Sequence, residues 1–307
     1  LEGGNNEEHE VSLKTSKEIK KALNKIKLEY KSIKVDPNNF EKKIIKNKNF
    51  ICLNALHGPF GEDGEIQKIL IKNKISFTHS NYRSSKNCFD KFKSKTIISK
   101  NKILTPKFIL VEKNDLNHRK LIEIKKMFKK FVIKPTKSGS SFGIKIIKTK
   151  KDFRNLINNI DMFKHKLKYH NEILIEEFIS GKELTVSTIK FLDKIKPLAV
   201  TEIKSKNSFF DYIAKYTKGY AKHILPAKIN VKDYNKCLNL ALKCHKILRC
   251  NSIARTDFIL NSKNKKIYFL EINTQPGLTL NYLLPEQAKY RKIMFIDIVL
   301  GILNKLN

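Results

Sequence analysis

The chain has 307 residues, more than one hydrophobic core usually organises, so two or three domains are expected. Its most apolar stretch, residues 294–303, is shorter than a membrane span and contains Asp297, which argues against a membrane partner. The formal net charge of +34 would suit a nucleic-acid binder, but six of the 63 basic residues are Arg and the lysines are spread along the chain, so we expect no specific nucleic-acid partner.

The cysteines indicate the compartment. The five cysteines are odd in number and show no CxxC spacing, which favours a reducing, cytoplasmic setting. The chain starts at Leu1 without a methionine, and we expect residues upstream of it to be missing.

Residues 1–95 are predicted to form an open parallel α/β domain. The expected elements are a helix after a Gly3-Gly4 turn, strands over 50–56 and 75–78, and helices over 65–72 and 81–95. Glu8 is one of several acids at the start of the first helix. These acids suit the positive end of a helix, and alternatively Glu8 receives a substrate ammonium. His57 ends a strand, where open α/β sheets bind their ligands.

Residues 96–182 are predicted to form a second domain with a loop suited to phosphates. The expected elements are strands over 105–110, 131–135 and 144–148, a further strand from Ile173, and a helix over 115–130. Lys134 stands before a loop of small residues, 136–143, which can fold over a triphosphate. A Ser/Gly hairpin turn without a ligand explains the loop equally well. Backbone groups near Phe178 and Ile179 are placed to read an adenine edge.

Residues 183–307 are predicted to form a third domain with a lid. The expected elements are strands over 184–191, 198–203, 252–260 and 267–272, and helices over 231–248 and 285–306. The aromatic and basic segment 204–227 is predicted to be the lid, because loops of this length in compact domains are usually lids or disordered.

The hairpin over 252–272 gathers charged residues on one face. Side chains of a strand alternate between faces, and a five-residue loop predicts three cross-strand pairs: Ile259 with Phe269, Asp257 with Glu271, and Arg255 with Asn273. Two opposed carboxylates repel, and a divalent cation with oxygen ligands removes that penalty. The alternative is a solvated strand edge with a salt bridge to Arg255.

Seven segments taken together resemble the D-alanine–D-alanine ligase family: EEHEVSL, ALHGPFGEDG, VIKPTKSGSSFG, LIEEFISGKELTV, FFDYIAKY, ARTDFIL and LEINTQPGLT. The resemblance covers essentially the whole chain. It implies an α/β (α+β) ATP-grasp fold, in which an open parallel α/β domain precedes two α+β domains that enclose ATP. It further implies that ATP drives the joining of two D-alanines through an acyl phosphate for peptidoglycan, with two Mg²⁺ or Mn²⁺ ions, in a cytoplasmic homodimer.

The resemblance also implies roles for particular residues. Those matched to ATP binding are Lys91, Lys134, Ser141, Glu176, Glu177, Phe178, Ile179, Glu183 and Lys215. Those matched to the metal ions are Asp257, Glu271 and Asn273, with Glu271 bridging both ions. Glu8 and His57 match the site of the first D-alanine, and Ser140 and Tyr216 would link with Glu8 to hold the lid shut. Arg255 and the Gly277 N–H would stabilise the oxyanion, and Lys215 would assist at the phosphate and the substrate carboxylate.

One position departs from the family pattern. Tyr282 stands where the family usually offers a serine hydroxyl to the carboxylate of the second substrate. The tyrosine at 216 accompanies an amine acceptor in the family, which favours D-alanine over D-lactate. Two alternatives remain: another ATP-grasp carboxylate–amine or D-alanine–D-lactate ligase, and a Lys-rich nucleic-acid-binding protein on a dead ligase fold.

Overall fold

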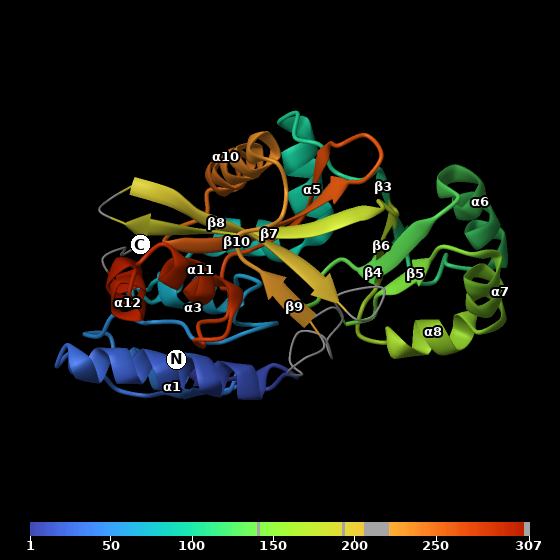
Figure 1. The fold of residues 1–307 in the computed structure, drawn as a ribbon. Coiled ribbons are helices and arrows are strands. Elements are labelled where there is room, and N and C mark those ends of the chain that lie inside the picture. The colour runs from blue at the N-terminus through green and yellow to red at the C-terminus, as the bar shows by residue number, and fades with distance from the viewer. Residues whose placement is uncertain (140–141, 192–193, 206–220, 304–307) are drawn as a thin grey trace.

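The computed structural model of the chain describes residues 1–139, 142–191, 194–205 and 221–303. Within these residues the strands form three sheets, in the orders β1-β2, β3-β6-β4-β5 and β11-β10-β7-β8-β9. The two larger sheets lie beside each other, and α10 covers the five-stranded sheet on the side opposite to α11 and α12 (Figure 1). The arrangement agrees with the expected mixture of helices and sheets.

The N-terminal unit is mostly helical. Its elements are β1 (Glu2–Gly3), α1 (His9–Lys25), β2 (Lys34–Val35), α2 (Phe40–Ile45), α3 (Glu65–Lys72), α4 (Tyr82–Phe89) and α5 (Lys91–Lys100). β1 and β2 pair in parallel, and Gly3 and Gly4 both take positive φ in the turn that leads to α1. The α1 residues Ile19, Ala22 and Leu23 pack against the C-terminal helices, so the two ends of the chain share a core.

Two predictions for this unit are wrong. The expected strands over 50–56 and 75–78 reduce to one parallel bridge between Cys52 and Phe77, because the segment is hydrogen-bonded on one side to Leu1 and on the other to 76–78 over only a few residues. The expected single helix over 81–95 is two helices. Asp90 interrupts it, since its extended backbone ends α4 while its carboxylate accepts the N–H of Lys93 to begin α5.

The four-stranded sheet is antiparallel throughout. Its strands are β3 (Phe108–Glu112), β4 (Phe131–Pro135), β5 (Lys145–Ile147) and β6 (Glu172–Glu177), and its helices are α6 (His118–Phe128), α7 (Lys150–Asn158) and α8 (Ile160–Lys166). A capping box of Thr149 and Asp152 starts α7, which satisfies backbone N–H groups that have no partner within the helix. Leu121, Phe131 and Ile175 are among the buried residues that join these helices to the sheet.

The five-stranded sheet carries the hairpin and the C-terminal helices. Its elements are β7 (Gly181–Phe191), β8 (Lys194–Ser205), β9 (Ala221–Ile224), α10 (Val231–Ile247), β10 (Ile253–Asn261), β11 (Ile267–Asn273), α11 (Leu283–Tyr290) and α12 (Phe295–Leu303). The expected single helix over 285–306 is wrong as well. It is broken over 291–294, where Lys292 takes a positive φ and Asp297 accepts the N–H of Met294.

The predicted domain boundaries at 95/96 and 182/183 fall inside α5 and β7, and the division into three domains stays a prediction. None of the described helices is long and apolar enough to cross a lipid bilayer.

Candidate active site

A cavity of about 310 Å³ lies between the two larger sheets. Its walls come from β4, β5 and β6 on one side and from β7, β10 and β11 on the other, with α5 contributing Lys91. The predicted site residues that line it are Lys91, Lys134, Glu176, Glu177, Phe178, Ile179, Glu183, Arg255, Asp257, Glu271 and Asn273. The structure therefore gathers at one place every described residue that the sequence assigned to nucleotide or metal.

The hairpin has the predicted register at its charged end. Asp257 pairs with Glu271, and Arg255 pairs with Asn273. The predicted pair of Ile259 with Phe269 is wrong, since Ile259 faces Tyr268 and Phe269 faces Phe258. A bulge at Leu270 shifts the register by one residue between the turn and the carboxylates.

Each of the two carboxylates has a cation of the protein beside it. Arg255 binds Asp257 through both oxygens, from Nε to Oδ1 at 3.0 Å and from a terminal nitrogen to Oδ2 at 2.8 Å. Thr185, on the neighbouring strand, donates to Asp257 Oδ1 at 2.6 Å. Lys91 Nζ lies 3.7 Å from Glu271 Oε2. Burial works to lower the pKa of Arg255, but the carboxylates of Asp257, Glu271 and Glu62 together outweigh it and hold that pKa above its ordinary value.

The donor set at the hairpin suits a hard divalent cation. Asp257 and Glu271 offer carboxylate oxygens with side chains 20% and 30% exposed, and Asn273 adds an amide that also accepts the N–H of Gln275 at 2.6 Å. These are oxygen ligands of the kind Mg²⁺ binds. No group of three His, Cys, Asp or Glu side chains in the described part of the chain is arranged for a metal. A metal ion at the hairpin would take its third protein oxygen from the Asn273 amide.

A buried chain of charges forms the wall near the expected nucleotide. Glu176 receives Lys134 Nζ on Oε1 at 2.6 Å and Lys95 Nζ on Oε2 at 2.8 Å. Burial works to raise the pKa of Glu176, but the charges of Lys134 and Lys95 outweigh it and hold the pKa below its ordinary value. Burial lowers the pKa of Lys95 to about 8, partly offset by Glu176.

At least two N–H groups of the predicted adenine segment already have backbone partners, and the first is Glu177, which donates to the carbonyl of Lys107 at 2.8 Å. The N–H of Phe178 donates to the carbonyl of Lys130 at 3.0 Å, so an adenine edge would be read by other groups of this segment. Lys148 Nζ lies 4.5 Å above the Phe178 ring. Lys91 donates to the carbonyl of Ser138 at 2.6 Å, which ties α5 to the loop after Lys134.

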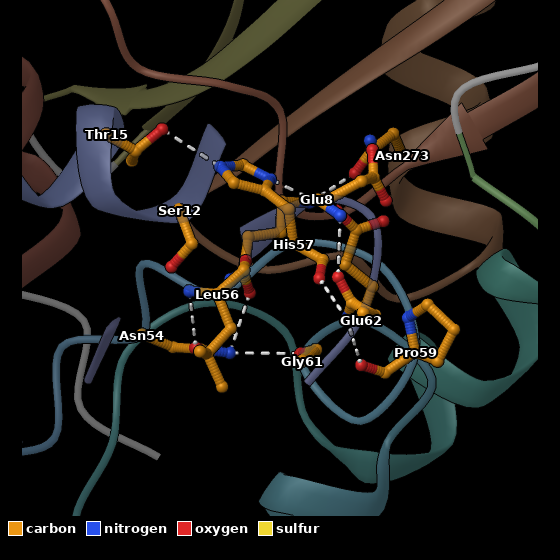
Figure 2. A network of polar contacts seen from close by, with 12 residues as sticks. Glu8, Ser12, Thr15, Asn54, Leu56, His57, Pro59, Gly61, Glu62 and Asn273 are labelled. Atoms are coloured by element: carbon orange, nitrogen blue, oxygen red, sulfur yellow. Dashed lines mark hydrogen bonds and ion pairs between the residues drawn. The ribbon is translucent and has the colours of Figure 1, made fainter. Parts of the chain in front are cut away.

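A second polar cluster surrounds Glu8 and His57 (Figure 2). His57 lies between Thr15, with Oγ1 2.9 Å from Nε2, and Glu62, with Oε1 3.3 Å from Nδ1. Burial raises the pKa of Glu62, and the neighbouring Glu8 adds to the shift. Asn273, from the hairpin, belongs to the same polar network (Figure 2).

Two glycines make room for the Glu8 carboxylate. A Cβ added at Gly58 would lie 2.6 Å from Glu8 Oε2, and one added at Gly139 would lie 2.5 Å from the same atom. Gly139 and Glu62 also line the cavity. The carboxylate predicted to hold a substrate ammonium is therefore enclosed by the loop after Lys134.

In the turn after the hairpin, the aromatic ring of Tyr282 packs against Gly277. A Cβ at Gly277 would lie 2.0 Å from Cδ2 of Tyr282, so the phenol ring covers the Gly277 backbone and only glycine fits there. Neither residue lines the cavity. Four further predicted residues, Ser140, Ser141, Lys215 and Tyr216, lie outside the described residues, as does most of the predicted lid.

Five residues of the site were missed by the sequence reasoning: Thr15, Glu62, Lys95, Thr185 and Gln275. Two of them had a local signal. Glu62 lies in the same glycine-rich loop as His57, and Lys95 follows Lys91 by one helical turn. Gln275, whose amide nitrogen donates to the Leu56 carbonyl and whose oxygen receives Asn54, had none.

Comparison with known proteins gives consistent results. A family model described as D-ala D-ala ligase C-terminus matches residues 97–304. The chain is 42% identical over 307 residues to the D-alanine–D-alanine ligase of Pelagibacter ubique strain HTCC1062, covering 99% of this chain and 95% of that protein. It is 39% identical over 301 residues to the D-alanine–D-alanine ligase of Wolbachia pipientis wMel, covering 97% and 90%. It is also similar to the solved D-alanine–D-alanine ligase of Bacillus anthracis complexed with ATP, with a TM-score of 0.79, 29% identity, and coverage of 99% and 94%.

Proposed function

The chain belongs to the D-alanine–D-alanine ligase family, and we propose that the cavity between its two larger sheets is where it joins two D-alanines at the expense of ATP, for peptidoglycan synthesis. One observation carries the proposal. The lysines expected to contact phosphates and the paired carboxylates Asp257 and Glu271 line the same cavity, and Glu8 lies next to it. The family uses ATP and Mg²⁺.

The reaction has two steps. The carboxylate of the first D-alanine attacks the γ-phosphorus of ATP, which gives an acyl phosphate and ADP. The amine of the second D-alanine then attacks the acyl carbon, and phosphate leaves. The chain must therefore hold a triphosphate, an ammonium and a developing oxyanion close together.

We assign the nucleotide to the wall formed by β4 and β6. Lys134 and Lys91 would face the phosphates, because both residues line the cavity. Residues Glu176–Ile179 would enclose adenine and Glu183 the ribose. Mg²⁺ held by Asp257, Glu271 and Asn273 would offset phosphate charge during transfer. Ser141 and Lys215 stay predicted nucleotide contacts.

We assign the first D-alanine to the cluster around Glu8. The carboxylate of Glu8 would hold the ammonium, and His57 would border the substrate with its ring fixed by Thr15 and Glu62. Arg255 and the N–H of Gly277 would stabilise the oxyanion of the second step, an effect that is large for preorganised donors. Tyr282, whose ring covers Gly277, would border the second D-alanine. Ser140 and Tyr216 would complete the closed site.

Location and assembly complete the proposal. We place the protein in the cytoplasm, since its five cysteines are free. From the family resemblance we propose that the protein is a homodimer. Analytical ultracentrifugation, which measures the mass of the particle in solution, tests this. The ordered set of Asp257, Glu271 and Arg255 favours a working ligase over a nucleic-acid binder on a dead ligase fold.

The test is ADP release by the purified protein with Mg²⁺ and a panel of D- and L-amino acids, followed by product analysis with D-alanine and D-lactate together. We expect release to depend on D-alanine and the main product to be D-alanyl-D-alanine. Equal release with every amino acid, or mainly depsipeptide at neutral pH, would contradict the assignment.

A further inference from the structure

Lys95 is a fully buried lysine behind the nucleotide wall. Its side chain is 0% exposed, and it does not line the cavity. A buried ammonium is costly unless its donors are all used. Lys95 Nζ lies 2.8 Å from Glu176 Oε2 and donates to Thr105 Oγ1 at 3.0 Å and to the Phe269 carbonyl at 3.4 Å. Lys95 therefore makes two hydrogen bonds and one ion pair, which together offset the cost of burying its charge.

These contacts join three parts of the fold. Lys95 is on α5, Glu176 is on β6 of the four-stranded sheet, and Phe269 is on β11 of the five-stranded sheet. Thr105 strengthens the junction, because its hydroxyl donates to the same Phe269 carbonyl at 3.0 Å. The two walls of the cavity are thus tied to one ammonium.

The Glu176 carboxylate divides its oxygens between two lysines. Oε2 receives Lys95, and Oε1 receives Lys134 Nζ at 2.6 Å. Two ammonium groups and one carboxylate leave one positive charge in excess, which favours a bound triphosphate. Without Lys95 this excess disappears, and both oxygens of Glu176 become available to draw Lys134 away from the cavity.

We propose that Lys95 is a positioning residue for nucleotide binding, which holds one oxygen of Glu176 so that the other presents Lys134 to the phosphates. This inference rests on the proposed function, since it takes the cavity to be the ATP site. Lys95 touches neither substrate nor cavity and acts through Glu176.

The test compares nucleotide and amino-acid binding in matched variants. Lys95→Met is compared with Lys100→Met, which removes an exposed lysine from the same helix. The measurements are the KM for ATP, the KM for D-alanine, and the Kd for a non-hydrolysable ATP analogue with Mg²⁺. We expect Lys95→Met to raise the ATP KM and the Kd for the analogue by about tenfold or more, which is the usual effect of losing a contact with a charged group. The D-alanine KM should stay unchanged. Lys100→Met should match the unmutated protein.

A double variant keeps the test valid if Lys95→Met folds poorly. Lys95→Met/Glu176→Gln removes both charges of the buried pair, and it should bind the analogue no more weakly than Glu176→Gln alone, because Lys95 acts through that carboxylate. A further tenfold loss in the double variant would overturn the proposal, as would Lys95→Met behaving like Lys100→Met or raising both KM values alike. If the unmutated protein binds no nucleotide, the function assigned to the cavity fails instead.

Discussion

Thr185→Val isolates one hydrogen bond behind the carboxylate pair. Thr185 is fully buried on β7, opposite Asp257 on one side and Thr201 on the other. Its hydroxyl donates to Asp257 Oδ1 at 2.6 Å, and valine replaces that hydroxyl with a methyl group of similar size. Of Thr185 and Arg255, the two side chains that hydrogen-bond to Asp257 in the described part of the chain, only Arg255 would then remain, and the carboxylate would turn toward its guanidinium.

The size of the effect follows from the contacts. A hydrogen bond to a charged group contributes about 1.5–3 kcal/mol, and since the Asp257 side chain is 20% exposed, water replaces part of it. We expect a loss of about 1–2 kcal/mol in the free energy of unfolding. Partners that orient a metal ligand typically change metal affinity or activity by about 10- to 100-fold. The Mg²⁺ concentration for half-maximal activity should rise by that factor.

Thr201→Val is the matched control. Thr201 is equally buried and faces Thr185 across the sheet, but its hydroxyl accepts the amide of Gln287 at 3.0 Å instead of contacting the site. ADP release against Mg²⁺ concentration and thermal unfolding are measured for both variants. Both should lose similar stability, and only Thr185→Val should need more Mg²⁺. The same Mg²⁺ requirement in the two variants would refute the role given to Thr185.

Three other changes probe the site. Glu271→Gln should abolish ligation while the protein stays folded, since it removes one of the opposed carboxylates; activity against Mg²⁺ and thermal unfolding are measured together. Gly139→Ala should raise the D-alanine KM by about 5- to 150-fold and leave the ATP KM unchanged, because its Cβ would lie 2.5 Å from a Glu8 oxygen and overpacking costs about 1–3 kcal/mol. Burial raises the pKa of Glu62 from 4.5, so the folded protein keeps a proton that the unfolded chain releases. Relative to Glu62→Gln, the unmutated protein should therefore lose stability as the pH rises above about 4.5, which melting curves at a series of pH values will show.

Specific outcomes would contradict these expectations. Near-normal ligation by Glu271→Gln at low Mg²⁺ would remove that residue from the metal site. For Gly139→Ala, the control is Lys137→Ala in the same loop, an exposed side chain, and an equal rise in D-alanine KM would show that any change in the loop suffices. A stability difference from Glu62→Gln that is flat with pH would mean that Glu62 is ionised in the folded protein as in the unfolded chain.

The hairpin shows what a sequence pattern can and cannot predict. Alternation in a strand fixes which side chains share a face, so the pairing of Asp257 with Glu271 followed from counting residues. A bulge adds one residue to a strand and is not visible in the alternation of side chains. For this reason Ile259 was predicted to pair with Phe269, whereas in the structure it pairs with Tyr268. The predicted pairs Asp257/Glu271 and Arg255/Asn273 were correct because the bulge lies between them and the turn.

Contacts between distant segments had no such signal. Thr185 and Asp257 are 72 residues apart, and Gly139, in the loop after β4, lies against the carboxylate of Glu8. Lys95 follows Lys91 by one helical turn, but nothing in the sequence shows that its side chain is fully buried and reaches Glu176 and Phe269. The family resemblance identified residues matched to its motifs, but it did not identify the side chains that hold those residues in place.

The sequence left two interpretations of the hairpin charges open: a site for a divalent cation, and a solvated strand edge with a salt bridge to Arg255. The structure contains features of both. The salt bridge from Arg255 to Asp257 exists. Asp257 lies on the inner strand β10 and Glu271 on the edge strand β11, but both residues line the cavity. Asp257 is held at 2.6–3.0 Å by Thr185 and Arg255, whereas Lys91 lies 3.7 Å from Glu271, whose side chain is more exposed. Cations of the protein therefore already offset the repulsion between the carboxylates. We therefore expect the chain to fold without a metal ion at this place, so that a change at Glu271 removes activity without unfolding the chain.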